Sequence, residues 1–390
     1  MNRTKKGVYA PIVQSSRCTH CEKCIQACPG IGINAHKISS TLFPAPLIKY
    51  RPDIGHYTGC YVGHATDPRV RQHSTSGGAI TALLSYLLEN QFIQGALVTK
   101  AHSTNPLETE SFIARSVDDL ELAATSRYCP TSPNTVLSEI LRENGVFAVV
   151  GLPCHIHGIR KAEEIYPVLK SKILLHVGLF CSGVPTFIGT YELLHQLGLE
   201  KSEIKQFKYR VGWPSNSVIT LKNGRIHHHH FQKTLLSKTW GLRFFLSPRC
   251  TLCFDTFNEL ADIAFGDAHL PRTDNSSLFR SLMITRTPYA DQILKRAVTH
   301  IHSEPVAPTT AARTQRGALQ FKGKVKTRIN MRQLLNKAVP QYDIKYSSPT
   351  PIDYGKSVFY YLNMACGSKE ELNRYIPYLA KIEHRVMPVQ

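Results

Sequence analysis

The chain has 390 residues, enough for two or three folded units, and its Lys and Arg residues outnumber Asp and Glu by 47 to 28. This excess favours an anionic partner, such as an acidic protein, a phosphorylated or carboxylated coenzyme, a nucleic acid or a membrane surface, although a solvated basic face has the same composition. No run approaches the roughly 18 apolar residues of a membrane-spanning helix, and the N-terminus lacks the apolar core of a secretion signal, so we expect a cytoplasmic protein with reduced cysteines.

Four cysteines lie close together near the N-terminus. Cys18, Cys21, Cys24 and Cys28 have the spacing C-x2-C-x2-C-x3-C, and Pro29 follows. This run is typical of bacterial ferredoxins, in which the thiolates hold a 4Fe-4S cluster. Zinc sites usually separate their ligands into two pairs, and a disulfide framework spreads cysteines over the whole chain. The sequence therefore predicts a small ferredoxin-like iron-sulfur unit over residues 1–45, with a proline-bearing linker at 41–47.

A second unit begins after this linker and has the pattern of an α/β domain. A helix entered through the glycine pair Gly77 and Gly78 is predicted to run to residue 89, and strands are predicted at 95–100 and 112–115. Residues 145–154 then form a short buried strand and a turn, 155–164 a helix, and 172–181 another buried strand. Two parallel strands joined by a helix end at the same sheet edge, so Cys154 and Cys181 should lie side by side there.

A later pair, Cys250 and Cys253, brings the number of such cysteines to four. A single C-x2-C pair also serves zinc and dithiol chemistry, so spacing alone leaves a second four-thiolate site and scattered core cysteines equally open. Cys60 is an alternative fourth ligand for the first site, because in two-cluster ferredoxins the last cysteine of such a run serves the other cluster; Cys28 is the simpler choice. Cys129 and Cys366 are interpreted as packed thiols.

The remaining segments carry weaker signals. The run His227 to His230 follows an Asn-Gly turn and is interpreted as an exposed strand or hairpin, because neighbouring side chains of a strand point to opposite faces and do not converge on a metal. Residues 306–390 form a basic, partly helical C-terminal region, with helices predicted at 358–364 and 369–385. No catalytic constellation is visible in it.

Five segments resemble the beta-subunit family of coenzyme F420 hydrogenase and dehydrogenase, which also includes 7-hydroxymethyl chlorophyll a reductase. They are residues 76–84, 127–134, 151–160, 178–181 and 250–267, in the order that the family has them. The resemblance implies an FAD-containing domain over about residues 55–305 with a 4Fe-4S cluster held by Cys154, Cys181, Cys250 and Cys253. The hydrogenase subunit itself lacks the N-terminal cysteine run, which is fused here as in larger relatives.

The resemblance also implies which residues contact the flavin: Ser76, Gly77, Gly78, Thr81, Arg127, Ser132 and Asn134. This is physically reasonable, since glycines let backbone N–H groups approach a diphosphate at a helix N-terminus and an arginine neutralises its charge. His155 and His157 follow Cys154 and are weak candidates for a catalytic proton donor. A structural role at the start of the helix fits the sequence equally well.

The function implied is that of an iron-sulfur flavoprotein oxidoreductase. It would pass electrons between a ferredoxin-like or other acidic one-electron carrier and an organic substrate, through two 4Fe-4S clusters and FAD. Coenzyme F420 is one candidate substrate, but no feature of the sequence specifies it. The alternative is an electron-transfer subunit of a larger complex, without turnover of its own. Nucleic-acid binding is the weakest interpretation, because no reader motif is present. The sequence leaves the oligomeric state open.

Overall fold

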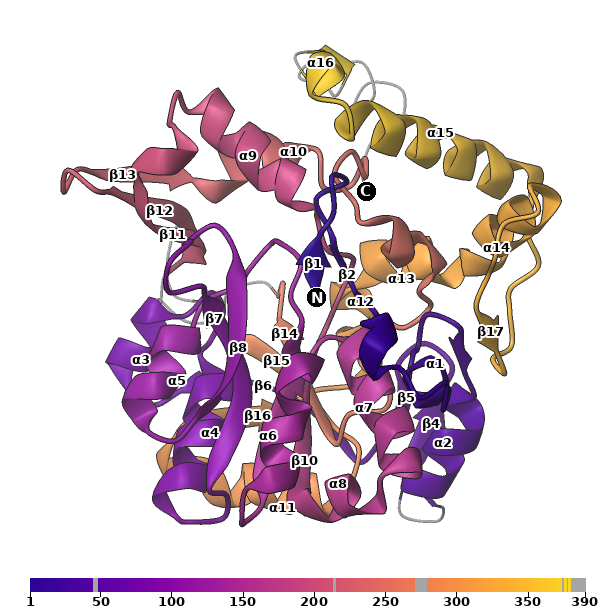
Figure 1. The fold of residues 1–390 in the computed structure, drawn as a ribbon. Helices are drawn as coiled ribbons and strands as arrows, with labels where there is room; N and C mark the ends of the chain where they lie inside the picture. The colour runs from indigo at the N-terminus through magenta and orange to yellow at the C-terminus, as the bar shows by residue number, and fades with distance from the viewer. Residues whose placement is uncertain (45–47, 213–214, 271–278, 374, 377, 380–390) are drawn as a thin grey trace.

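The computed structural model describes residues 1–44, 48–212, 215–270, 279–373, 375–376 and 378–379, and its centre is a mixed sheet of eight strands (Figure 1). The strand order is β16-β6-β15-β14-β10-β9-β7-β8. In chain order the strands are β6 (Gly59–Ala65), β7 (Gly95–Ala101), β8 (Thr109–Ala114), β9 (Phe147–Gly151), β10 (Ile173–Leu179), β14 (Ile263–Asp267), β15 (Ser281–Thr285) and β16 (Ile301–Pro305). The strands β14, β10, β9 and β7 are parallel, and the flanking pairs are antiparallel.

Helices cover both faces of this sheet, because alternate strand residues point to opposite sides. One apolar core contains Leu175 and Val177 of β10 with residues of α4 (Ala79–Glu89) and α11 (Pro288–Arg296). The core on the other face contains Phe147 and Val149 of β9 with residues of α6 (Leu137–Arg142) and α7 (Pro153–Ile165). Three shorter helices complete this part: α3 (Pro68–His73), α5 (Val117–Ala123) and α8 (Pro167–Lys172). The predicted α/β architecture is confirmed as a mixed α/β fold.

The predicted strand-helix-strand unit is present as β9, α7 and β10. The two strands are parallel neighbours, with Gly151 opposite Gly178. The helix begins at Pro153, earlier than predicted, since proline is favoured in the first helical turn. Cys154 therefore lies in the first turn of α7, and Cys181 follows the end of β10 at the same edge of the sheet.

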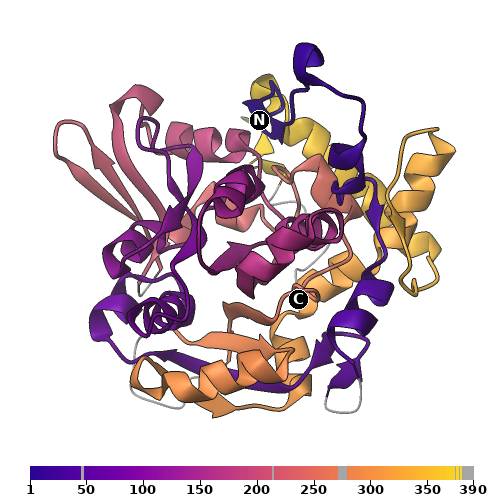
Figure 2. The same ribbon diagram turned by 60° about the horizontal axis from the view of Figure 1, so that its bottom comes forward.

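A three-stranded antiparallel sheet projects from the body of the molecule (Figures 1 and 2). It consists of β11 (Ile204–Val211), β12 (Asn216–Leu221) and β13 (Ile226–His230), and packs with α9 (Phe187–Gln196) and α10 (Leu235–Lys238) around a core of its own. The four histidines lie on β13, which forms the predicted hairpin with β12. His228 is exposed, whereas the other three are half-buried. Cys129 is packed in this core, as predicted.

The N-terminal region is joined to distant parts of the chain. It contains β1 (Asn2–Arg3), β2 (Tyr9–Ala10), α1 (Lys23–Gln26), β3 (Gly32–Ile33) and α2 (Ala35–Leu42), followed by β4 (Lys49–Arg51) and β5 (Gly55–Tyr57). Strand β3 pairs in parallel with β17 (Gln341–Tyr342), and Ile38 of α2 packs into the core beside α7. The iron-sulfur unit predicted for residues 1–45 is thus in contact with the main domain. The predicted domain limits remain predictions.

The C-terminal region is helical, with α12 (Pro308–Thr314), α13 (Arg316–Gly323), α14 (Val325–Leu334), α15 (Pro351–Gly367) and α16 (Glu370–Asn373). The helix predicted at 358–364 lies within α15, whose start is fixed by a capping box between Thr350 and Asp353. Eight of the 17 residues of the helix predicted at 369–385, and residues 45–47 of the predicted linker, lie outside the described residues. No helix in the described part of the chain combines the length and apolar character needed to cross a bilayer.

Candidate functional site

The thiols of the second predicted set converge from three separate segments. Cys154 begins α7, Cys181 follows β10, and Cys250 lies in a short 3-10 turn (Pro248–Leu252) that ends at Cys253. Although Cys154 is exposed to solvent, the protein packed around its thiol and the nearby thiols Cys253, Cys181 and Cys250 raise its pKa. Burial, with the neighbouring Cys181, also raises the pKa of Cys250 to about 12. The fold therefore brings the four sulfurs into one electrostatic neighbourhood.

Hydrogen-bond donors point at the sulfurs of this set. The Val184 backbone N–H donates to Cys250 Sγ at 3.4 Å, and the Lys322 ammonium donates to Cys253 Sγ at 3.4 Å. Such bonds to ligand thiolates are usual in iron-sulfur proteins, where they help to set the reduction potential.

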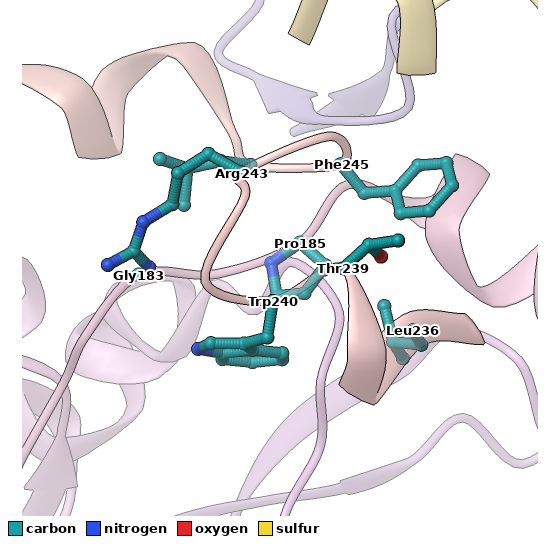
Figure 3. Close-up of a pocket in the computed structure, with 8 residues that line it drawn as sticks. Gly183, Pro185, Leu236, Thr239, Trp240, Arg243 and Phe245 are labelled. Carbon is teal, nitrogen blue, oxygen red and sulfur yellow. The ribbon is translucent and has the colours of Figure 1, made fainter. Parts of the chain in front are cut away.

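Three buried cations surround the same cysteines. Lys322 and Arg328 are each 1% exposed and Arg243 is 6% exposed. Arg328 Nε donates to the Thr251 carbonyl at 2.6 Å, between Cys250 and Cys253 in sequence. The Arg243 guanidinium extends toward the loop of Gly183, away from Phe245 (Figure 3), and donates to the Ser182 carbonyl at 3.2 Å.

These cations indicate what the site can hold. Within the described residues, none of the three forms an ion pair with a carboxylate. The buried carboxylate of Asp255 acts on Lys322 through its charge, but the three cations outnumber it. Burying such an excess of positive charge is costly, so the site suits an anionic group. A 4Fe-4S cluster with four thiolates is such a group. The residues present therefore fit the cluster that the resemblance implied.

The spacing of the side chains bears on the alternative of a zinc site. Among the described residues, no three His, Cys, Asp or Glu side chains are arranged to hold a single metal ion. In a tetrahedral zinc site every ligand sulfur lies about 2.3 Å from one ion, whereas the thiolates of a four-iron cluster each bind a different iron and stand further apart.

The first cysteine run forms an exposed loop. All four of its thiols are exposed, and the Gly30 N–H donates to Cys28 Sγ at 3.3 Å. His20 and Glu22, on either side of Cys21, have positive φ angles of 54° and 57°, which bend the loop sharply. Cys60 lies on β6 in an apolar core, 4% exposed. This placement favours Cys28 as the fourth ligand of the first site.

The two cysteine sets are linked by direct contacts. Arg249, which precedes Cys250, donates from Nη2 to the Pro29 carbonyl at 2.6 Å. Lys161 of α7 donates to the carbonyls of Cys28 at 3.0 Å and Gly32 at 2.8 Å. The loop after the first run therefore packs against both α7 and the 3-10 turn that carry ligands of the second site.

The segments predicted to hold the flavin also meet. The Ser126 N–H donates to Thr75 Oγ1 at 2.7 Å, which joins the loop before α4 to the loop at 125–134. Helix α4 starts after Gly78, whose φ is +76°, and has no side-chain cap, so its first N–H groups are available to an anion such as a diphosphate. Thr81 lies in the first turn, and the Ser76 hydroxyl donates to the Arg280 carbonyl at 3.0 Å.

Gly77 has a packing explanation that does not need a ligand. A Cβ there would lie 2.7 Å from the carbonyl oxygen of Gly63 and 2.7 Å from the backbone nitrogen of Ser281, so no side chain fits between the loop and strands β6 and β15. Glycine is therefore required at position 77 because the backbone of neighbouring strands approaches closely, and at position 78 because the residue that caps the helix has a left-handed conformation.

Buried polar atoms without partners lie in the loop at 125–134. Arg127 donates from Nη1 to Thr125 Oγ1 at 2.9 Å, while its buried Nε has no partner. Asn134 donates to the His155 carbonyl at 3.3 Å, and its buried Oδ1 has no partner. Thr125, a β-branched residue, has φ of 78°, a strained conformation common at ligand sites. The Ser132 carbonyl accepts from Thr135. These unused donors and acceptors fit a polar cofactor such as FAD.

The two histidine candidates have structural partners. His157 Nε2 lies 2.9 Å from Asp255 Oδ2, and its ring stacks on Phe254. Leu152 N–H donates to His155 Nδ1 at 3.2 Å, and burial lowers the pKa of His155 to about 4, so its imidazole is neutral at pH 7. A proton-donating role for either one stays a prediction.

A buried ion network holds the elements of the site together. Arg160 and Glu163 of α7 form ion pairs with each other at 3.2 Å, and Arg160 also pairs with Asp262 at 2.9 Å. His176 of β10 lies between Glu163 Oε1 at 2.8 Å and Asp262 Oδ2 at 2.9 Å. The network thus joins the helix of Cys154, the strand of Cys181 and the segment after Cys253.

Sequence reasoning missed the residues that act through burial. Lys322 and Arg328 stand in a basic stretch that has the pattern of a solvated face, and Arg243 is an isolated cation. The nearest family segment, residues 250–267, does not include any of these three residues, so the sequence contained no signal for them. Their position depends on the packing of α13 and α14 against the turn at 248–252.

Comparison with known proteins decides the family. Models of the coenzyme F420 hydrogenase/dehydrogenase beta subunit match residues 60–138 for its N-terminal part and 145–309 for its C terminus, together more than half of the chain. The chain belongs to this family. The predicted resemblance is thereby confirmed. The matched ranges contain Cys154, Cys181, Cys250 and Cys253, and the first cysteine run precedes them.

Relatives within the F420 hydrogenase/dehydrogenase beta-subunit family cover most of the main domain. Coenzyme F420 hydrogenase subunit beta of Methanothermobacter thermautotrophicus is 31% identical over 258 residues, which are 63% of this chain and 83% of that protein. F420-dependent formate dehydrogenase subunit beta of Methanocaldococcus jannaschii is 26% identical over 209 residues, 52% of this chain and 51% of that protein. A chain of the F420-reducing NiFe hydrogenase complex from Methanosarcina barkeri, solved as a xenon derivative, superposes with a TM-score of 0.58 at 21% identity, covering 75% of this chain and 98% of that chain. This superposition shows a shared fold.

Proposed function

We propose that the protein is an iron-sulfur flavoprotein oxidoreductase that passes electrons between a one-electron carrier and an organic two-electron substrate. The observation that carries the proposal is the convergence of Cys154, Cys181, Cys250 and Cys253 on three buried cations, beside a second, exposed cysteine loop. Two 4Fe-4S clusters would carry single electrons, and FAD, when bound, supplies the conversion to hydride-type chemistry. The relatives named for coenzyme F420 make that deazaflavin the first substrate to test.

The exposed loop supports an entry point for an acidic electron carrier. Among the first 40 residues Glu22 is the single acidic residue, against six Lys and Arg residues. Large apolar side chains near the loop are also exposed: Ile12, Val13, Ile25 and Ile31. Exposed apolar side chains together with an excess of cations suit a negatively charged protein that delivers electrons over a short distance.

A second candidate function is that of an electron-transfer subunit within a larger complex. The named relatives favour it, since two of them are designated subunits of a hydrogenase and a formate dehydrogenase. In that case the chain would exchange electrons with a partner that performs the other half-reaction.

The experiment that separates the two functions uses the full chain reconstituted anaerobically with iron, sulfide and FAD. With chemically reduced ferredoxin as donor, we expect the enzyme-bound flavin to be reoxidised by coenzyme F420 in repeated turnovers, followed by the loss of F420 absorbance. Reduction of artificial dyes without turnover of F420 or any other organic acceptor supports the subunit function and overturns the first proposal.

Arg127 provides a test of the flavin site. We expect Arg127→Ala to weaken FAD binding about 10-fold to 100-fold, because a hydrogen bond from a charged group is worth about 1.5–3 kcal/mol. Arg127→Lys keeps the charge and should retain part of the affinity. The measurement is flavin fluorescence during titration of deflavinated protein. Arg69→Ala, at a side chain that is 81% exposed, is the control. Unchanged affinity in Arg127→Ala would remove Arg127 from the flavin site.

A further inference from the structure

Lys322 occupies an unusual position for a lysine. It is 1% exposed at the end of α13, and its ammonium donates both to Cys253 Sγ at 3.4 Å and to the Asp255 carbonyl. Its neighbour Phe321 packs against the two other cations, with the ring centroid 4.1 Å from the guanidinium carbons of Arg243 and of Arg328.

The three buried cations act on different atoms. Arg328 and Arg243 donate to the backbone carbonyls of Thr251 and Ser182 and so hold the cysteine-bearing loops in place. Of the three, Lys322 is the one whose hydrogen bond reaches a sulfur. Its charge therefore acts on the ligand set at the shortest range, while the two arginines donate to the loop backbone and reach the sulfurs through their charge alone.

A positive charge at this place changes the relative stability of two redox states. Reduction of a 4Fe-4S cluster adds one electron from the external donor and makes the cluster more negative by one charge. In a buried environment the attraction to an adjacent cation is strong, and it is larger for the more negative, reduced state. The electron comes from the external donor and is taken up by the cluster, so the step is a transfer of one electron.

We propose that Lys322 sets the reduction potential of the second cluster, raising it through a charged hydrogen bond to the Cys253 thiolate. The proposal rests on the proposed function, since it requires a cluster on Cys154, Cys181, Cys250 and Cys253. It makes Lys322 a tuning residue that favours electron flow from the exposed first cluster toward the second.

The test is a potentiometric titration of the full, anaerobically reconstituted chain, with dithionite as reductant and electron paramagnetic resonance as readout. In Lys322→Met we expect the midpoint potential of the second cluster to shift to lower values while the first cluster is unchanged. Lys322→Gln keeps a donor without the charge and should fall in between, and Lys322→Arg should restore the wild-type value. Lys324→Met is the matched control, since Lys324 lies nearby on the chain but is 38% exposed and pairs with Asp353 at 3.1 Å.

The possible outcomes separate the two proposals. A wild-type chain that binds iron at the first site alone would contradict the proposed function and remove the basis for this inference. A second cluster that is present, with the same potential in Lys322→Met as in the wild type, overturns the role of Lys322. If Lys322→Met does not retain the cluster, the Gln variant decides: an unshifted potential there also overturns the proposal, and a shift toward lower values supports it.

Discussion

Replacing Cys250 and Cys253 together by serine is expected to halve the iron content of anaerobically prepared protein, from about eight to about four irons per chain. The two thiols supply half of the second ligand set, and both lie within the buried, cationic neighbourhood that suits an anionic cluster. Serine hydroxyls are much poorer ligands for iron than thiolates. The measurement is iron and acid-labile sulfide per chain, with electron paramagnetic resonance of the reduced protein to show that the first cluster remains.

Two single replacements complete this experiment. Cys366→Ser, at a half-buried cysteine outside both sets, should leave about eight irons per chain and serves as the control. Cys60→Ser should leave the same iron content, because Cys60 is packed in an apolar core on β6. Unchanged iron in the Cys250/Cys253 double variant would show that the second site is assigned wrongly, and loss of iron in Cys60→Ser would show that Cys60 serves the first site.

Replacing Asp262 by asparagine is expected to destabilise the protein by about 3–5 kcal/mol, since removing one partner of a buried ion network leaves the others uncompensated. Asp262 accepts from the His176 backbone N–H at 2.7 Å in addition to its contacts with the His176 ring and Arg160. The measurement is urea unfolding of the anaerobic protein, followed by circular dichroism. Asp67→Asn, which removes an exposed ion pair at 3.4 Å, should change the free energy of unfolding by less than about 0.5 kcal/mol.

The same carboxylate makes a prediction about pH. Burial alone would raise the pKa of Asp262, but the charges of Arg160 and His176 and the hydrogen bonds from His176 hold it well below its usual range. A carboxylate whose pKa is depressed by folding stabilises the protein above its unfolded pKa of about 4, and this stability is lost as the pH falls through the folded pKa. We expect the free energy of unfolding of the wild type to fall below about pH 4 more steeply than that of Asp262→Asn. Equal slopes for the two proteins would contradict this account.

The sequence predicted the parts of the fold that depend on local patterns. Short apolar runs identified β9 and β10 as buried strands, and the segment between them was correctly predicted as the helix α7, because these signals lie within the elements themselves. The position of Cys154 and Cys181 at one edge followed from that topology. The N-terminal cysteine run was equally clear as a pattern, because its spacing is typical of ferredoxin ligands, although that spacing left both Cys28 and Cys60 open as the fourth ligand.

The remaining features depend on contacts between distant residues. The insertion of β14 between β10 and β15 brings Cys250 and Cys253 to the site, and no local pattern contains that strand order. Lys322 has the same sequence signature as a solvated lysine, and only the tertiary packing of α13 shows that it is buried. The sequence did not predict the Arg160 network for the same reason. Its four members come from α7, β10 and the segment before β14, which are distant in the sequence.

The pairing of β3 with β17 has a consequence for the order of assembly. Gly32 lies opposite Gln341, and the loop after Cys28 is also held by Lys161 and Arg249. During synthesis the first cysteine run therefore leaves the ribosome well before any of the residues that anchor it. If this run binds iron as proposed, its thiols would be accessible throughout that time, and the last of these contacts, which fix its position relative to the second cysteine set, would form only after β17 has been made. The relative position of the two cysteine sets would thus be fixed late in folding.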